Sequence, residues 1–322
     1  MRNVMRWLAA CAALAGLCTV QAQEYPSRPV RVLVPYTPGG ITDLVTRITA
    51  GELSKSLGQT FVVDNRPGAN SILAVDMVSK ATPDGYTLGT VIAAHAANQT
   101  LYAKLPYDSI KSFEHVSLLV TSPLIVCATN SLPATSIKEL IEIAKAKPGQ
   151  LTFASSGIGA AAHLTTELFM ATTGIKMTHV PYKGTVPALN DVIAGHIQVL
   201  FSDAPPALPQ ITGGKVRALG VTTAKRIEVA PDIAPINDTV KGFDTAPWQM
   251  LMAPAGTPAP VIDKLHKELV AYIASTEGQK KLKEMGLVPG APTPPAELSK
   301  LVAREVVAWG DLVKKANAEG IE

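Results

Sequence analysis

Two glycine-rich segments could bind an anion through main-chain groups alone. Residues 36–43 read Tyr-Thr-Pro-Gly-Gly-Ile-Thr-Asp, residues 155–159 read Ser-Ser-Gly-Ile-Gly, and each segment joins a predicted strand to a predicted helix. Glycine lets N–H groups approach an oxygen without a Cβ in the way, and a helix N-terminus carries roughly half a positive charge. Either loop alone is also compatible with a simple tight turn. If the two loops belong to two separate lobes that face each other, as argued below, they favour a carboxylate site that needs no arginine.

Polar side chains near these loops have less specific roles. We expect Asp43 to cap its own helix, because a carboxylate beside an anion pocket is otherwise repulsive. In a third loop, residues 65–71, Asn70 or Ser71 could cap a helix or donate to a ligand, and capping is the simpler expectation. His163 lies within the helix after the second loop, where an imidazole is more often packed than functional.

Two charged residues come just after predicted strands, at positions that could line a cleft. They are Lys183 and Asp203. Exposed charges usually have no specific role, so their positions alone assign neither of them a ligand contact.

The sequence gives little support for a catalytic role of the same residues. Residues 157–162 fit a dinucleotide-binding glycine pattern, but the next predicted strand is followed by Pro-Tyr-Lys at 181–183 and not by an acid for the ribose hydroxyls. A hydrolase needs an activated nucleophile, and Ser155 lacks the Gly-x-Ser-x-Gly elbow. The six histidines show neither an HExxH pair nor a cysteine partner at ligand spacing. We therefore expect no catalytic residue, no metal and no cofactor.

The first 22 residues are predicted to be a signal peptide. Arg2 and Arg6 precede an apolar run over residues 7–20, and the small residue Ala22 fits a signal-peptidase cleavage site. The run is shorter than the ~20 residues of a membrane-spanning helix, and polar sequence follows it at once. We expect export to the periplasm and cleavage near Ala22.

Removal of that leader leaves an almost neutral protein. The leader holds two arginines and no acid, so 27 basic and 26 acidic residues remain. Nucleic-acid and membrane-surface binding both need clustered basic residues, which the sequence does not show. Cys11 and Cys18 leave with the leader, so Cys127 has no partner for an internal disulfide and is expected to be a buried thiol.

Short β-branched runs alternate with helix-length amphipathic segments from Pro29 onward, which predicts an α/β fold. The first unit shows the pattern well. Residues 30–34 read as a strand, and the following helix has an apolar face made by Leu44, Ile48, Leu53 and Leu57.

The length of the chain favours two domains, because about 300 mature residues exceed what one core usually organises. The alternation breaks twice, in residues 116–129, where a Ser-Pro pair interrupts a strand-like stretch, and in residues 246–253. We interpret both breaks as crossings between lobes that form a hinge. The predicted first lobe comprises residues 23–121 and 253–322, and the predicted second lobe comprises residues 122–252.

Several short motifs are spread along the mature chain. They include residues 28–30 (Arg-Pro-Val), 35–40 (Pro-Tyr-Thr-Pro-Gly-Gly), 64–69 (Asp-Asn-Arg-Pro-Gly-Ala), 83–88 (Pro-Asp-Gly-Tyr-Thr-Leu), 105–108 (Leu-Pro-Tyr-Asp), 156–159 (Ser-Gly-Ile-Gly), 179–184 (His-Val-Pro-Tyr-Lys-Gly) and 253–258 (Ala-Pro-Ala-Gly-Thr-Pro). With these motifs the chain resembles the Bug or TctC family of tripartite tricarboxylate transporter receptors over essentially its whole mature length.

The resemblance implies a two-lobed periplasmic-binding-protein fold, with two sheets flanked by helices and joined by a two-crossing hinge. It also implies a monomeric receptor that closes around a small organic carboxylate and delivers it to membrane permease subunits, without catalysis and without a nucleic-acid partner. A sensing or protein-interaction role without transport is the alternative. Dicarboxylates, tricarboxylates, acidic amino acids and aromatic acids all stay open as ligands.

In this family the loop after the first strand typically holds the ligand carboxylate, partly through water, and the Ser-Gly-x-Gly loop of the other lobe closes over it. Carried over by position, the ligand-binding residues are Tyr36, Pro38, Gly39, Gly40, Thr42, Ala69, Asn70, Ser155, Ser156, Gly157, Gly159 and Asp203. The chain departs from the family at Asn70 and Ser71, where many relatives have further glycine, and at Ala160, where a hydroxyl residue is common. These departures lie at the far end of the expected ligand.

Overall fold

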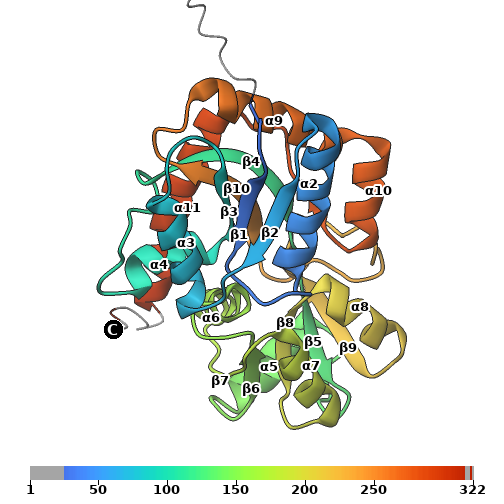
Figure 1. Cartoon of the computed structure of the whole chain (residues 1–322). Coiled ribbons are helices and arrows are strands. Elements are labelled where there is room, and N and C mark those ends of the chain that lie inside the picture. The colour runs from blue at the N-terminus through green and yellow to red at the C-terminus, as the bar shows by residue number, and fades with distance from the viewer. Residues whose placement is uncertain (1–24, 316–319, 321–322) are drawn as a thin grey trace, which may run out of the picture.

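The computed structural model describes residues 25–315 and residue 320. These residues form two β-sheets, each flanked by helices, one above the other in Figure 1. The predicted signal peptide, residues 1–22, lies outside the described residues. None of the helices in the described ranges has the length and apolar character that a bilayer crossing requires.

The first sheet has six strands in the order β11-β4-β10-β3-β1-β2. Neighbours β2, β1 and β3 are parallel, whereas β10 runs antiparallel to both β3 and β4. The strands are β1 (Val30–Val34), β2 (Phe61–Asn65), β3 (Thr87–Ile92), β4 (Phe113–Thr121), β10 (Trp248–Pro254) and β11 (Val288–Pro289). We call this sheet and its helices the first lobe.

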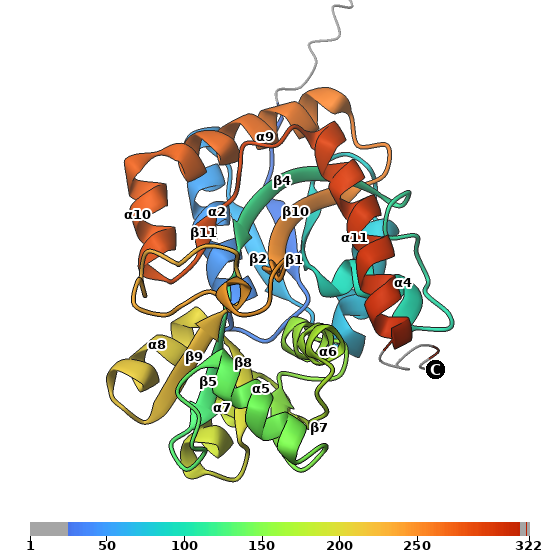
Figure 2. The same cartoon turned by 180° about the vertical axis from the view of Figure 1, so that it is seen from behind.

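Helices from both ends of the chain cover the first sheet. Two hydrophobic clusters hold them there, one with Leu298 and Trp309 from the C-terminal helix and one with Leu265 and Leu269 from the helix over residues 259–274. Figure 2 shows these C-terminal helices from behind. The helices are α2 (Ile41–Leu57), α3 (Ile72–Ser79), α4 (Ala94–Leu101), α9 (Ala259–Ala274), α10 (Thr276–Glu284) and α11 (Pro295–Lys315), with a short 3₁₀ turn, η1 (Ala69–Ser71).

The second sheet has five strands in the order β7-β6-β8-β5-β9, of which β7, β6 and β8 are parallel and β5 is antiparallel to its neighbours. Its strands are β5 (Leu124–Thr129), β6 (Thr152–Ser155), β7 (Thr178–Pro181), β8 (Val199–Asp203) and β9 (Val216–Val221). Its helices are α5 (Ile137–Ala146), α6 (Ala161–Thr173), α7 (Thr185–Ala194), α8 (Ala204–Thr212) and a 3₁₀ turn, η2 (Ile236–Asp238). We call this sheet and its helices the second lobe.

The chain passes between the sheets twice, from β4 to β5 and from β9 to β10. The two crossings are hydrogen-bonded to each other, since Ser122 N–H donates to Pro247 O over 2.6 Å. The predicted boundary between residues 252 and 253 falls inside β10, whose main chain pairs with β3 and β4 in the first sheet. A division that follows the sheets therefore places that crossing before Trp248, and the domain division itself stays a prediction.

The predicted apolar face of α2 is confirmed except at Leu44, since Leu53 is buried and Ile48 and Leu57 pack against the same core cluster. Leu44 is 39% exposed, while Val45, Thr46, Thr49 and Leu53 are buried against the sheet. Threonine can be buried here because its hydroxyl returns to the main chain of its own helix: Thr49 Oγ1 donates to Val45 O over 2.9 Å. A pattern that counts only apolar residues misses such a face.

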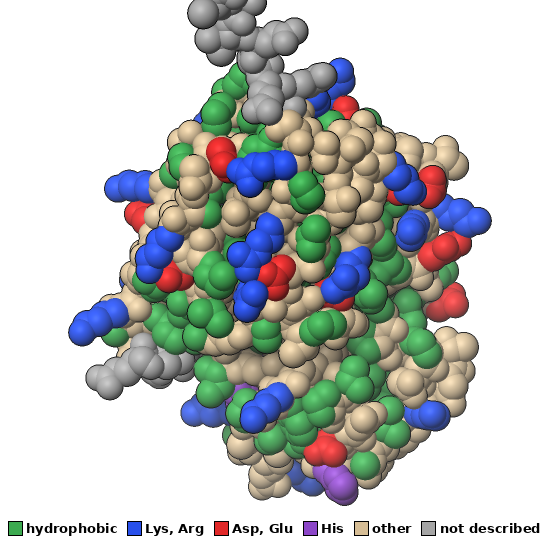
Figure 3. All heavy atoms as spheres, in the orientation of Figure 1, with side chains coloured by type: hydrophobic (Ala, Val, Ile, Leu, Met, Phe, Trp, Pro, Cys, Tyr) green, Lys and Arg blue, Asp and Glu red, His purple; other side chains and the backbone are tan. Residues whose placement is uncertain are grey.

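Two sequence-derived expectations about the interior and the surface can be compared with the structure. Cys127 is fully buried in β5, and burial raises the pKa of its thiol to about 12, so it is inert as predicted. On the face shown in Figure 3, basic side chains lie interspersed with acidic ones. This mixed surface agrees with the nearly neutral charge of the predicted mature sequence.

Candidate functional site

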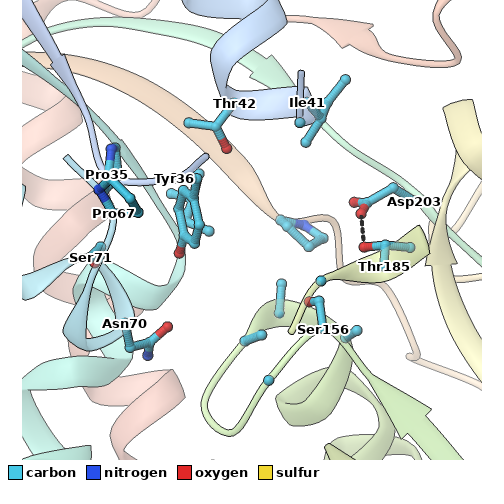
Figure 4. Close-up of a pocket in the computed structure, with 18 of the residues that line it drawn as sticks. Pro35, Tyr36, Ile41, Thr42, Pro67, Asn70, Ser71, Ser156, Thr185 and Asp203 are labelled. Carbon is cyan, nitrogen blue, oxygen red and sulfur yellow. Dashed lines mark hydrogen bonds between the residues drawn. The ribbon is translucent and has the colours of Figure 1, made fainter. Parts of the chain in front are cut away.

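A cleft of about 720 Å³ lies between the two lobes and is lined by residues of both (Figure 4). Eight of the twelve residues predicted to contact a ligand line it, namely Tyr36, Gly40, Thr42, Ala69, Asn70, Ser156, Gly157 and Asp203. Pro38, Gly39, Ser155 and Gly159 belong to the same loops but do not line it. The two glycine-rich loops therefore face one cavity.

The first loop presents the start of α2 to the cleft. Gly40 is the N-cap residue, and the N–H groups of Ile41 and Thr42 have no acceptor in the described part of the chain. Gly39 has a left-handed φ of 85°, and its N–H donates to Asp43 Oδ2 over 2.9 Å. The N–H of Gly39 is thus committed within the loop, and the free donors are those of the first turn of the helix.

Asp43 organises the loop before this helix, but the expected cap is not formed, because Gly40 is the N-cap residue and α2 has no side-chain cap hydrogen bond. Besides the Gly39 N–H, its carboxylate accepts from Arg47 Nε and Asn65 Nδ2, each over 2.9 Å. Burial alone would raise the pKa of Asp43, but these hydrogen bonds outweigh it and hold the pKa below its usual value. Asp43 is therefore an ionised, fully occupied acceptor that shapes the loop.

The turn at Ala69, Asn70 and Ser71 is strained. All three residues have positive φ, at 45°, 45° and 79°, a region that costs non-glycine residues about 1–3 kcal/mol each. The expected capping by Asn70 or Ser71 is wrong. Ser71 is the N-cap residue of α3 but makes no side-chain cap hydrogen bond, and Asn70 Nδ2 donates instead to Asn98 Oδ1 over 2.9 Å.

Asn98 of α4 holds this turn and was missed in the sequence. It is fully buried, and its amide donates to Asn70 O over 2.8 Å while its oxygen accepts from the Asn70 side chain. These bonds offset the strain of the turn. A single asparagine among the alanines of residues 94–98 was the only signal available.

The second loop rests on two stacked imidazoles. The rings of His163 and His179 have centroids 4.0 Å apart. His163 Nδ1 accepts from Gly159 N–H over 3.1 Å, and His179 Nε2 lies 2.7 Å from the Oγ of Ser155, which also accepts from Gly157 N–H over 3.2 Å. His163 is therefore a packed residue, as expected, and together with His179 it sets the shape of the loop.

Both histidines are neutral at neutral pH. Burial lowers the pKa of His163 to about 4, with a contribution from His179, and burial lowers the pKa of His179 to about 4 as well. Ser155 is fully buried beneath the loop, so its contact with His179 is shielded from a bound molecule. The pair is placed to support the loop rather than to attack a substrate.

Acid should destabilise the protein through this pair. An unfolded histidine takes up a proton below about pH 6.5, whereas the folded pair resists protonation until about pH 4, so stability is complete above pH 6.5 and is lost as pH falls toward 4. Between pH 7 and pH 4.5, we expect the melting temperature of the His179→Asn variant to fall by roughly 3 °C less than that of the wild type. The measurement is a thermal melt across that range.

The exposed His196 of the same lobe provides the control, since its side chain is 72% accessible. His196→Asn should follow the wild-type acid profile. An identical acid loss in His179→Asn and His196→Asn would contradict the role given to the stacked pair.

Two cleft residues carry polar groups with few partners. The Tyr36 hydroxyl is buried and makes no hydrogen bond with any described residue, and burial raises the pKa of Tyr36, so it stays a neutral donor. Asp203 accepts from Thr185 Oγ1 over 3.1 Å and from Ser122 Oγ over 3.4 Å, and burial raises its pKa as well. Lys183 is exposed where it lines the cleft.

The described residues contain no group of three or more His, Cys, Asp or Glu side chains that could hold a metal ion. The cleft instead offers main-chain N–H groups at the start of a helix and neutral hydroxyls. Groups of this kind bind carboxylates.

Comparison with known proteins identifies the family. The model of the tripartite tricarboxylate transporter family receptors, TctC, matches residues 45–318. The chain belongs to the TctC family. Relatives of known structure have the same fold: an R. palustris protein with adipate has a TM-score of 0.85 and 36% identity over 92% of this chain and 100% of its own. The predicted α/β fold with two helix-flanked sheets is confirmed.

Two further relatives of known structure share this fold. The periplasmic binding protein BugD has a TM-score of 0.82 and 36% identity, covering 92% of this chain and 100% of its own. MatC from Rhodopseudomonas palustris with bound malate has a TM-score of 0.80 and 31% identity, covering 90% of this chain and 100% of its own. The TctC family is thus one of periplasmic solute-binding receptors.

Proposed function

We propose that this TctC protein binds a small organic carboxylate in the interlobe cleft. The contacts would come from the loop after β1, the strained turn and the second loop, that is from the cleft-lining members of the predicted set together with Ile41. Pro38, Gly39, Ser155 and Gly159 would act by shaping these loops. The ligand carboxylate would lie at the start of α2.

The Tyr36 hydroxyl is the observation that carries this proposal. It is a buried donor without a partner among the described residues, in the same cleft as the unpaired N–H groups of Ile41 and Thr42. A buried polar group left unpaired costs about 1–3 kcal/mol, so a ligand oxygen that accepts from it recovers that cost. An anion with several acceptor oxygens satisfies all these donors at once.

Titration calorimetry against a carboxylate panel tests the proposal. The relatives with adipate and with malate suggest linear dicarboxylates of four to six carbons as the first probes. We expect at least one of them to bind with 1:1 stoichiometry. Absence of heat for every member, combined with no shift in melting temperature, would refute carboxylate binding.

The Tyr36→Phe variant gives a sharper result. We expect its affinity for the best ligand to fall about 10-fold, because one hydrogen bond to a charged oxygen is lost, while the ligand-free stability stays unchanged. Tyr272→Phe is the control, since Tyr272 Oη is also buried without a partner but does not line the cleft. Equal affinities in the two variants would show that Tyr36 makes no ligand contact.

The same proposal extends to the protein's place in the cell. We infer export to the periplasm after cleavage near Ala22, a monomeric receptor, delivery of the bound solute to membrane permease subunits, and no catalysis. Recovery of the bound carboxylate chemically unchanged after prolonged incubation is the expected result. Conversion of the ligand by the purified protein would contradict the receptor role.

A further inference from the structure

The cleft contains a carboxylate of its own. Asp203 ends β8 and lines the cavity on the opposite side from Tyr36 and Asn70, as Figure 4 shows. A second carboxylate from a ligand would be repelled at this position unless something lies between the two charges. The surroundings of Asp203 therefore bear on which carboxylates the cleft accepts.

The helix that follows does not neutralise Asp203. Asp203 is the N-cap residue of α8, where a side-chain oxygen normally accepts from the N–H of the second or third helical residue. Those residues are Pro205 and Pro206, which have no N–H, and Asp203 makes no cap hydrogen bond. The carboxylate is held at a helix start that cannot satisfy it.

Other protein groups satisfy it only in part. Oδ2 accepts from Thr185 Oγ1 over 3.1 Å, and the contact of Oδ1 with Ser122 Oγ is long at 3.4 Å. Within the described residues no lysine, arginine or histidine forms an ion pair with Asp203. When ionised, the carboxylate has about four acceptor positions, of which these contacts use two, so acceptor capacity remains at a residue that lines the cleft.

We propose that Asp203 selects carboxylate ligands that carry a hydrogen-bond donor, a hydroxyl or an ammonium group, on their carbon chain. This rests on the proposed carboxylate-binding function and narrows its ligand class to hydroxy and amino acids. The ligand carboxylate lies at the start of α2, and the donor pairs with Asp203. The donor separates the two negative charges and completes the hydrogen bonding of the buried acid.

Matched ligands test the inference by calorimetry. For each of two chain lengths the probes differ only in the donor: succinate, malate and aspartate, and glutarate, 2-hydroxyglutarate and glutamate. We expect the wild type to bind a hydroxy or amino member at least about 10-fold tighter than the unsubstituted diacid of the same length. The Asp203→Asn variant should reduce this preference to less than about 3-fold.

The two donors are distinguished by the same variant. An asparagine oxygen still accepts from a hydroxyl but no longer offers a charge to an ammonium group, so Asp203→Asn should weaken amino-acid binding more than hydroxy-acid binding. Asp232→Asn is the control, because Asp232 is exposed in the second lobe and does not line the cleft. It removes the same charge and should keep the wild-type ranking.

Three results would overturn the inference. Unsubstituted diacids that bind the wild type as tightly as their substituted partners would show that the cleft does not use the donor. An unchanged order of ligand affinities in Asp203→Asn would show that another residue recognises the hydroxyl or ammonium group of the ligand. No heat for any of these six probes, while another carboxylate of the panel binds, would overturn the inference alone. No binding by any carboxylate of the panel would refute the carboxylate-binding function on which the inference rests. A melting temperature of Asp203→Asn close to that of the wild type verifies that the variant is folded.

Discussion

Replacing Gly159 with alanine is expected to lower ligand affinity by about 100-fold, equivalent to about 2.7 kcal/mol. Gly159 belongs to the second lobe, yet a Cβ placed on it would overlap Leu101 Cδ2 and lie 2.9 Å from Asn70 Nδ2, both in the first lobe. Leu101 is fully buried and Asn70 is fixed by Asn98, so neither can give way cheaply. The methyl group would hold the lobes apart around a bound ligand.

The control for this variant lies at the other end of the same helix. Gly174 follows α6 with φ 70°, close to the 74° of Gly159, but a Cβ there meets no atom within 4 Å. Both alanine variants should lose about 1–2 kcal/mol of folding stability from the left-handed backbone. Only Gly159→Ala should lose affinity in calorimetry. Retained affinity in Gly159→Ala at matched stability would show that the lobes need not meet at this point.

The architecture was predictable because it follows from local periodicity. The strand over residues 30–34 was predicted and observed as β1, and the stretch predicted at 116–129 is β4 and β5, separated by the Ser-Pro pair at 122–123. Residues 246–253 read as an apolar run in either lobe, so the predicted boundary after residue 252 falls inside β10. Only the pairing of β10 with β3 and β4 shows which sheet it joins.

The glycine-rich loops could be located in the sequence from their residue types. The acceptors of their glycine N–H groups could not be predicted. The N–H of Gly39 goes to Asp43, that of Gly157 to Ser155, and that of Gly159 to His163. These acceptors depend on side-chain rotamers and on a neighbouring strand, which residue spacing does not reveal. Sequence therefore locates the loops, while the donors open to the cleft lie at residues adjacent to the glycines.

Asn98→Leu is expected to weaken ligand binding about 30-fold and to cost about 1–3 kcal/mol of stability. Leucine fills a similar volume, but it leaves Asn70 O and the Asn70 amide without their partners, and the left-handed turn at residues 69–71 loses the bonds that offset its strain. Because this turn lines the cleft, its relaxation removes ligand contacts. Calorimetry gives the affinity, and denaturant unfolding without ligand gives the stability.

A loss of stability alone does not prove that Asn98 positions the turn, so a matched loss elsewhere on α4 is needed. Ser109→Ala removes a fully buried hydroxyl that donates over 2.9 Å to the main-chain oxygen of His95, a residue of α4. The substitution does not affect the turn at residues 69–71. It should lower stability with unchanged affinity. Asn98→Asp keeps an acceptor for the Asn70 amide but loses the donor to Asn70 O, so its affinity should lie between wild type and Asn98→Leu. If affinity instead followed stability across all three variants, Asn98 would be an ordinary core residue rather than the support of the binding turn.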